Sequence, residues 1–338
     1  MVVTTQTYGQ FLLNGMLNFT GTFFASIAES LHHDSVWRFL NGAKLSSKVI
    51  FEKAKQDIVY SSKGYLIFDD SVLDKSHSKK IEIARWQYSG NTHKTVMGIG
   101  VVNCVYYNPE LDRYWIIDAR IYQPDQDGKK KYIHVEEMLL KAIERGVVFR
   151  TVLMDTWYAI QRLMYTIDTL GYKFVCPIRS NRQILDLWTD PDNPKYRPVK
   201  ELPWKDEQEL KVGKTIKLRQ CSLKMKLFRI SVHPNRTDYV VTNDFDQINT
   251  SQDATKACAV RWNIEQYHRE VKQLTGIGKC QARNGKAQRK HINVAILTWL
   301  VLNAQAHAMN KTIYQVKEEP LKMFQAALWR RPHIAFSC

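Results

Sequence analysis

Residues 65–70 read Tyr-Leu-Ile-Phe-Asp-Asp, a short apolar run that ends in two acids. A continuous apolar run of this length is typical of a strand buried on both faces of a sheet. A similar run returns at residues 147–155, Val-Val-Phe-Arg-Thr-Val-Leu-Met-Asp, and it too ends in an aspartate. Each run therefore predicts a buried strand that delivers an acid at its carboxyl end.

The segments around these two runs predict one α/β core. We expect strands at 65–68, 96–107, 113–122, 147–155 and 172–176 (stopped by Pro177), with helices at about 133–145 and 157–170. The order β-β-β-α-β-α-β is that of the ribonuclease-H-like mixed sheet, in which the first and fourth strands are parallel neighbours. Neighbouring strands are about 4.8 Å apart, so Asp70 and Asp155 should converge at the carboxyl ends.

A third acid lies on a predicted helix with two distinct faces. Residues 261–272 read Arg-Trp-Asn-Ile-Glu-Gln-Tyr-His-Arg-Glu-Val-Lys. Helical spacing places an apolar stripe beside a polar stripe, the first made of Val260, Ile264, Tyr267 and Val271 and the second of Arg261, Glu265, His268 and Lys272. We expect this helix to run from about 252 to 274, with Ser251 as its N-cap and Gly276 closing it.

The rest of the chain suggests further parts. We divide it into an N-terminal helical region (1–61), a first part of the core (62–180), a β-rich insertion (181–250), a last part of the core (251–310) and a C-terminal tail (311–338). Helices at about 25–29 and 34–40, joined by a short turn, resemble a helix-turn-helix that binds DNA, although a simple helical cap explains them equally well. We expect strands at 215–219, 226–232 and 239–242 in the insertion, and a last apolar helix at 292–308.

Composition points to a polyanionic partner. The 338 residues include 49 Lys and Arg against 33 Asp and Glu, a formal net charge of +16. Such an excess favours binding to nucleic acid over a generic basic surface. The six cysteines form no C-x-x-C pair, which argues against a zinc ribbon and favours a reducing compartment. No long apolar run or leader is present, so we expect no membrane span and a cytoplasmic protein.

The three acids predict a metal site. Asp70, Asp155 and Glu265 would repel one another unless divalent cations neutralised them, and hard oxygen ligands suit Mg²⁺ or Mn²⁺. Two such ions can activate an attacking hydroxyl and stabilise a leaving oxygen in phosphodiester chemistry.

These residues resemble those of the DDE transposases of bacterial insertion sequences, in the group with the YREK signature and a β-strand insertion before the catalytic glutamate. The similarity runs over about residues 62–310. Arg261, Glu265 and Lys272 match the last three positions of the signature, whereas Cys258 stands where the tyrosine is expected. The resemblance favours Asp70 over Asp69 as the first acid; adjacent strand residues point to opposite faces, so only one should ligate metal.

The resemblance implies roles for the remaining residues. Asp70, Asp155 and Glu265 would be the catalytic and metal-binding acids, and two ions of Mg²⁺ (or Mn²⁺) would be the cofactor. DNA phosphates would be contacted by Arg261, Lys272 and Arg179, while His268 contacts DNA or supports Glu265. We expect Trp262 in the core. Further backbone contacts, if these are not merely solvated charges, would come from Lys75, Lys79, Lys80, Arg283, Arg289 and Lys290.

The implied function is transposition. The protein would bind the terminal inverted repeats of an insertion sequence, cleave the element ends and join the 3′-hydroxyls to target DNA. The resemblance also implies a hairpin intermediate, a homodimer in a paired-end complex, and a location near the bacterial nucleoid. A metal-dependent nuclease of the same fold and a catalytically inactive DNA-binding regulator are the alternatives. Short inverted repeats flanking the gene would distinguish a transposase from both.

Overall fold

The structure is a computed structural model that describes residues 2–15, 18–28, 30–78, 80–90, 92–187, 195–233 and 236–331. The chain divides into two units. Unit 1 comprises residues 1–58, 71–101 and 267–338, and unit 2 comprises residues 59–70 and 102–266. Strands β1 and β3 and helix α10 each contribute residues to both units.

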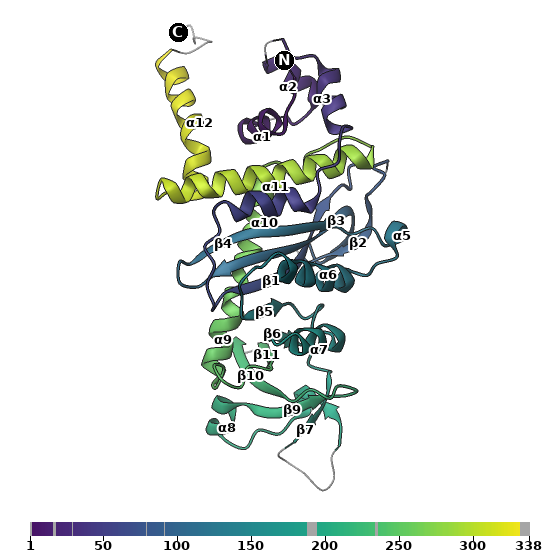
Figure 1. Cartoon of the computed structure of the whole chain (residues 1–338), viewed down its shortest axis with the longest axis vertical. Coiled ribbons are helices and arrows are strands. Elements are labelled where there is room, and N and C mark those ends of the chain that lie inside the picture. The colour runs from purple at the N-terminus through teal and green to yellow at the C-terminus, as the bar shows by residue number, and fades with distance from the viewer. Residues whose placement is uncertain are drawn as a thin grey trace, which may run out of the picture. The chain divides into compact units, whose positions relative to one another are not determined.

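Unit 2 is built on one large mixed sheet. Strand β4 pairs with β3, and from β3 the order runs β1-β5-β6-β11-β10-β9-β7-β8 (Figure 1). The strands are β1 (Tyr65–Asp74), β3 (Lys94–Asn108), β4 (Arg113–Ile121), β5 (Thr151–Met154), β6 (Lys173–Ile178), β7 (Gln183–Asp186), β8 (Arg197–Pro198), β9 (Lys214–Leu218), β10 (Met225–His233) and β11 (Arg236–Thr242). The helices are α5 (Pro124–Asp127), α6 (Lys131–Glu144), α7 (Gln161–Thr169), the 3₁₀ turn η1 (Val199–Glu201), α8 (Glu207–Val212), α9 (Ser251–Val260) and the start of α10 (Trp262–Leu274).

The core of this sheet has the predicted ribonuclease-H-like order. Strands β1 and β5 are parallel neighbours, with Tyr65 opposite Thr151 and Phe68 opposite Met154. Strand β6 then pairs in parallel with β5. The apolar runs that predicted β1 and β5 are buried, as are Phe174 and Val175 of β6. The α/β fold class and the pairing of the first and fourth strands are therefore confirmed.

The β-rich insertion extends the same sheet. Strand β11 pairs antiparallel with β6, and β10 pairs antiparallel with both β11 and β9. The three strands predicted here are present as β9, β10 and β11. The short elements β7, β8 and α8 were not predicted, because runs of two to six residues carry little periodicity.

Strand β6 continues past the proline that we expected to stop it. Val240 of β11 lies opposite Pro177 in the antiparallel pair. Pro177 lacks only an N–H, so its carbonyl and its extended backbone still suit a strand end. The prediction of a strand end before Pro177 was wrong.

Strand β1 is also longer than predicted, since it runs through Asp69 and Asp70 to Asp74. In unit 1 its second half lies against β3. A Cβ on Gly98 would come within 2.7 Å of the Leu73 carbonyl oxygen, so the missing side chain permits this close approach. The two acids thus lie inside a strand and not at its end. The fourth strand and the second core helix start later than predicted, at Thr151 and Gln161.

The long helix predicted over 252–274 is two helices, α9 and α10, separated at Arg261. The Arg261 N–H donates to the Cys258 carbonyl three residues back, and the Asn263 side-chain amide donates to the Val260 carbonyl. These bonds replace the regular ladder at the junction. The N-cap is Thr250 and not Ser251, because Thr250 forms a reciprocal capping box with Asp253.

Unit 1 contains helices at both ends of the chain. They are α1 (Thr5–Asn14), α2 (Gly21–Ile27), α3 (His33–Leu40), α4 (Ser47–Lys55), the rest of α10, α11 (Gly285–Ala308) and α12 (Ile313–Arg330), together with strand β2 (Arg85–Ser89) paired antiparallel with β3. The N-terminal helices α1, α3 and α4 contact α11 (Figure 1). Helix α11 begins seven residues before the predicted start at 292, since Asn284 caps it and its polar first turns are buried. Helix α12 occupies the segment that we described as a tail, opened by a capping box between Thr312 and Gln315.

In the part of the chain that the structure describes, no single helix is both long and apolar enough to cross a membrane. Among the described helices, α11 and α12, which meet at 91°, would together be long and apolar enough as a bent pair, by length and composition alone.

Candidate active site

Two acidic segments meet at neighbouring strands in unit 2. The parallel register of β1 and β5 reaches Phe68 opposite Met154, and the next residues along the two chains are Asp69 and Asp155. Asp70 follows one position later. The predicted convergence of the strand acids on one region of the sheet is therefore present.

Asp70 is held by two side chains from other elements. The ammonium of Lys131, the first residue of α6, lies 2.5 Å from Asp70 Oδ2. The hydroxyl of Tyr158 donates to Asp70 Oδ1 at 2.7 Å. Burial and the charge of Asp70 raise the pKa of Tyr158 well above its ordinary value, so the hydroxyl remains a proton donor.

Asp155 is oriented by the backbone of the loop that follows it. Its Oδ1 accepts the N–H groups of Trp157 at 2.9 Å and Tyr158 at 3.2 Å. Burial raises the pKa of Asp155 and the charge of Asp70 raises it further, whereas these N–H groups and Arg261 act in the opposite direction. Tyr158 thus bonds to both strand acids, through its N–H to Asp155 and through its hydroxyl to Asp70.

Arg261 connects the helix acid with the strand acids. Its guanidinium lies 2.7 Å from Glu265 Oε1 and 3.8 Å from Asp69 Oδ2. Burial raises the pKa of Asp69, and the charges of Asp155 and Asp70 raise it further. Asp69 and Asp70 therefore both belong to this cluster, one beside Arg261 and the other beside Lys131, whereas we expected only Asp70 to contribute.

The two faces of the predicted helix are present in α10. Ile264, Tyr267 and Val271 of the apolar stripe are buried. The polar stripe, made of Arg261, Glu265, His268 and Lys272, is half-buried. Trp262 is 53% exposed, so the prediction that it belongs to the core was wrong.

An exposed aromatic residue adjoins Asp155. Trp157 is 65% exposed, and the guanidinium carbon of Arg179 lies 4.7 Å from the centre of its ring. This is the distance of a cation–π contact. Arg179, which we expected to contact DNA, is thus positioned by Trp157 in the same unit as the acids.

Two of the predicted phosphate contacts are buried in unit 1. Lys75 is fully buried, and its ammonium donates to the carbonyls of Gly278 and Cys280 at 2.7 Å each. Lys290 is also buried, 4.1 Å from the centre of the Phe39 ring. The Lys75 ammonium binds backbone carbonyls and the Lys290 ammonium lies over an aromatic ring. The expectation that these two lysines lie at the surface was therefore wrong.

The other basic positions of unit 1 are accessible to different degrees. Lys80 and Arg283 are exposed, and Arg289 is half-buried. Lys79 lies outside the described residues.

Cys258, at the signature position where tyrosine was expected, lies half-buried on α9. Burial raises the pKa of its thiol to about 11, so the thiol is uncharged at neutral pH. Among the described residues Cys104, Cys176, Cys221, Cys258 and Cys280 are free.

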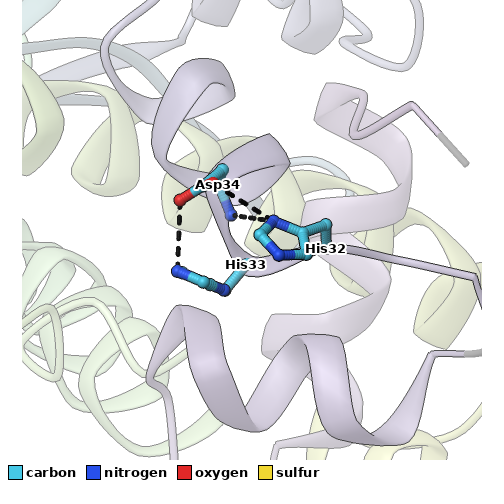
Figure 2. A group of neighbouring side chains, drawn as sticks. All are labelled: His32, His33 and Asp34. Atoms are coloured by element: carbon cyan, nitrogen blue, oxygen red, sulfur yellow. Dashed lines mark hydrogen bonds and ion pairs between the residues drawn. The ribbon is translucent and has the colours of Figure 1, made fainter.

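A separate group of metal-binding residue types lies at the start of α3. His32, His33 and Asp34 are the only described side chains of this kind whose ligand atoms all lie within 4.8 Å of one another (Figure 2). They are exposed and consecutive, with His33 Nε2 3.1 Å from Asp34 Oδ1 and His32 Nδ1 3.2 Å from Asp34 Oδ2. His32 also caps the helix by accepting the Asp34 N–H. The group is therefore a local helix cap, and we do not assign it to the acid cluster.

The comparisons with known proteins show the family of this chain. A family profile described as "Transposase DDE domain" matches residues 61–301, which is more than half of the chain. The chain belongs to the transposase DDE domain family. No curated protein matches it.

One similar solved structure is the Drosophila P element transposase strand transfer complex, at 10% identity and a TM-score of 0.29. The match covers 51% of this chain and 37% of that one, so this transposase domain aligns with well under half of the structure's length. A likeness at that TM-score does not define the fold, which rests on the strand order.

The acids of this DDE domain are of the ligand type that a hard divalent cation takes, although their ligand atoms do not all lie within 4.8 Å of one another as those of His32, His33 and Asp34 do. The acid side chains offer oxygen ligands, and the raised pKa of Asp155 comes in part from the neighbouring charge of Asp70. Lys131 and Arg261 partly balance that charge. Neither Lys131 nor Tyr158 was assigned to the site from the sequence. The signals available were the basic run at 129–131 and a tyrosine three residues after Asp155.

Proposed function

We propose that this protein is a DNA transposase that cleaves the ends of an insertion sequence and joins the freed 3′-hydroxyls to target DNA. The observation that carries the proposal is the acid cluster. Asp70 lies within β1, Asp155 directly follows the neighbouring parallel strand β5 of this DDE-family core, and Glu265 is joined to the same cluster through Arg261. No side chain in this arrangement is required as a covalent nucleophile.

Asp70, Asp155 and Glu265 would hold Mg²⁺ or Mn²⁺, as two ions. Bound there, the ions supply charge stabilisation to the attacking and leaving oxygens of a phosphodiester. The chain's own groups set the geometry. Tyr158 fixes Asp70 and Asp155 relative to each other, and Arg261 orients Glu265.

Basic side chains would hold the DNA backbone. In this proposal Arg261, Lys272 and Arg179 contact phosphates near the cleaved end, and Arg283 contacts the backbone farther away. His268 contacts DNA or supports Glu265. Helices α2 and α3 would recognise the terminal inverted repeats as a helix-turn-helix. The net charge of +16 supports a polyanionic partner.

The finer assignment follows the signature residues. We place the protein in the YREK group of bacterial insertion-sequence transposases, on the basis of Arg261, Glu265 and Lys272. This placement proposes a hairpin on the element ends and a homodimer that cleaves in a paired-end complex. It also proposes a cytoplasmic protein associated with the nucleoid.

The test is an in vitro cleavage assay with Mg²⁺ and labelled DNA that carries the element's own ends. Asp70→Asn, Asp155→Asn and Glu265→Gln should each lower end cleavage by about a thousandfold or more while DNA binding persists. Asp69→Asn is the matched comparison, because it makes the same carboxylate-to-amide change at the adjacent acid.

Each result decides a different part of the proposal. Cleavage without joining would indicate a nuclease, and binding without cleavage in both Mg²⁺ and Mn²⁺ would indicate a regulator. If Asp69→Asn abolished cleavage while Asp70→Asn did not, the first acid would be Asp69.

A further inference from the structure

One carboxylate oxygen of Asp70 forms an ion pair with a lysine of the same chain. Lys131 Nζ lies 2.5 Å from Asp70 Oδ2, and Oδ1 accepts the Tyr158 hydroxyl at 2.7 Å. A divalent ion on Asp70 needs a carboxylate oxygen with a free direction of approach. Each carboxylate oxygen keeps a second lone pair, but the Lys131 ammonium on Oδ2 is a positive charge that repels a divalent ion and therefore competes with it for this carboxylate.

We propose that Lys131 is an exchangeable cation: it neutralises Asp70 until a divalent ion takes Oδ2, and then pairs with a backbone phosphate of bound DNA. This inference rests on the proposed function, since it assumes that Asp70 binds metal and that DNA lies beside it. It adds a phosphate-binding residue that the signature does not contain. It also makes metal binding and DNA binding depend on each other.

The two partners of Asp70 differ in their freedom to move. The Lys131 side chain is 27% exposed and is carried on a flexible four-carbon stem at the first position of α6. Tyr158 is only 2% exposed and its backbone N–H is tied to Asp155. Lys131 can therefore leave Asp70 without disturbing it, while Tyr158 keeps the carboxylate in place.

Lys129, two residues earlier in the same basic run, forms an ion pair with an acid outside the site. Lys129 lies 2.6 Å from Glu137, which also pairs with Arg120. Lys131 is the lysine whose partner is an acid of the site. Its other neighbour is the ring of Tyr122, with 5.3 Å from the ammonium to the ring centre. An ammonium held by a carboxylate and a ring face can exchange that carboxylate for a phosphate of equal charge.

The exchange predicts a reciprocal coupling. An ion that displaces Lys131 frees a positive charge for DNA, and DNA that binds Lys131 frees Oδ2 for the ion. By linkage the two effects must be equal in free energy. Metal should therefore bind more tightly in the presence of DNA, and Lys131 should account for part of that gain.

The affinity for Mn²⁺ in the absence of DNA tests whether Lys131 competes with the metal for Asp70. It can be measured from the electron paramagnetic resonance signal of the free ion. In the full chain without DNA, Lys131→Met should tighten Mn²⁺ binding about three- to tenfold, because it removes a competing cation. Tyr158→Phe should weaken binding by a similar factor, because Asp70 loses its fixed partner. Lys129→Met, the matched control two residues away, should leave Mn²⁺ affinity unchanged.

The opposite signs separate exchange from a merely structural role. If Lys131 only supported Asp70, Lys131→Met would weaken Mn²⁺ binding as Tyr158→Phe does, and the inference would be overturned. Unchanged affinity in Lys131→Met would overturn it as well. If Asp155→Asn bound Mn²⁺ as tightly as the unaltered protein, the proposed metal site would be rejected, and the inference would be rejected with it.

A second titration, with a short duplex present, tests the phosphate. The unaltered protein should bind Mn²⁺ several-fold more tightly with DNA than without it, and Lys131→Met should lose most of that difference. Lys129→Met should retain it. An equal DNA-dependent gain in Lys131→Met and in the unaltered protein would show that Lys131 does not transfer to the DNA.

Discussion

At the scale of single residues, Arg261 has the most demanding geometry in the acid cluster. Its guanidinium reaches Glu265 at 2.7 Å and Asp69 at 3.8 Å at the same time. A planar guanidinium presents several donors in a fixed fork, whereas an ammonium is a single point of charge. Arg261 therefore depends on its shape as well as on its charge.

We predict that Arg261→Lys lowers end cleavage about tenfold, equivalent to about 1.4 kcal/mol, while DNA affinity changes little. Arg261→Met should lower both. A single-turnover cleavage assay beside a filter-binding assay measures the two effects. Arg179→Lys is the comparison variant at a basic position whose guanidinium lies over the Trp157 ring. Equal cleavage by Arg261→Lys and the unaltered protein would mean that only the charge matters.

The sequence predicted the acids of this cluster but not the residues that hold them. Asp70, Asp155 and Glu265 could be assigned because short apolar runs and helix spacing are local patterns, even though Asp70 lies inside β1 and not at its end. Lys131 and Tyr158 lie 61 and 88 positions from Asp70 in the chain. No periodic pattern records contacts at such separations, and they depend on how α6 and the loop after β5 pack in the folded unit.

At the scale of elements, the break between α9 and α10 sets where Arg261 stands. Thr250 accepts the Asp253 N–H at 3.1 Å, and Asp253 accepts the Thr250 N–H at 2.9 Å. This capping box fixes the first turn of α9, ten residues before Arg261. The sequence indicated a helix start here, but the cap lay one residue earlier than Ser251 because the threonine has the better reciprocal partner.

We predict that Thr250→Ala lowers the free energy of unfolding by about 1 kcal/mol, because the Asp253 N–H loses its side-chain acceptor and the bond from the Thr250 hydroxyl to Asp253 Oδ2 is lost. Thr250→Ser should retain nearly all of the stability. The midpoint of urea denaturation measures the difference. Thr255→Ala is the matched control on the same helix, since its hydroxyl donates only to the Ser251 carbonyl inside the helix. An equally large loss of stability in Thr255→Ala would show that the capping box contributes no more than an ordinary side-chain hydrogen bond within the helix.

At the scale of the whole molecule, the sequence predicted the sheet better than the helical parts. The apolar strands of unit 2 are buried, so their patterns are continuous and easy to recognise. In unit 1, helix α11 buries Gln288, Lys290 and His291 together with its apolar residues. A polar sequence that becomes buried gives no amphipathic signal, which explains why the predicted start at residue 292 was late.

His291 illustrates how unit 1 joins the two ends of the chain. It is fully buried, its Nδ1 lies 2.9 Å from the Tyr8 hydroxyl, and its Nε2 lies 3.0 Å from the Gly276 carbonyl. These partners suit the neutral ring with its proton on Nε2. Burial lowers the pKa of His291 from 6.5 to about 4.

The lowered pKa fixes the sign of a pH effect on stability. Between pH 6.5 and about 4 the unfolded chain binds a proton at His291 that the folded chain does not. This histidine therefore reduces the free energy of unfolding as the pH falls through that window, by up to about 3 kcal/mol.

We predict that His291→Gln, which cannot titrate, flattens the pH dependence of stability over the same range, even if it lowers stability at pH 7. Urea denaturation at a series of pH values measures this slope, with His77→Gln as the exposed control. A slope in His291→Gln as steep as in the unaltered protein would mean that other groups drive the acid sensitivity, and that the contact between Tyr8 and His291 tolerates a charged ring.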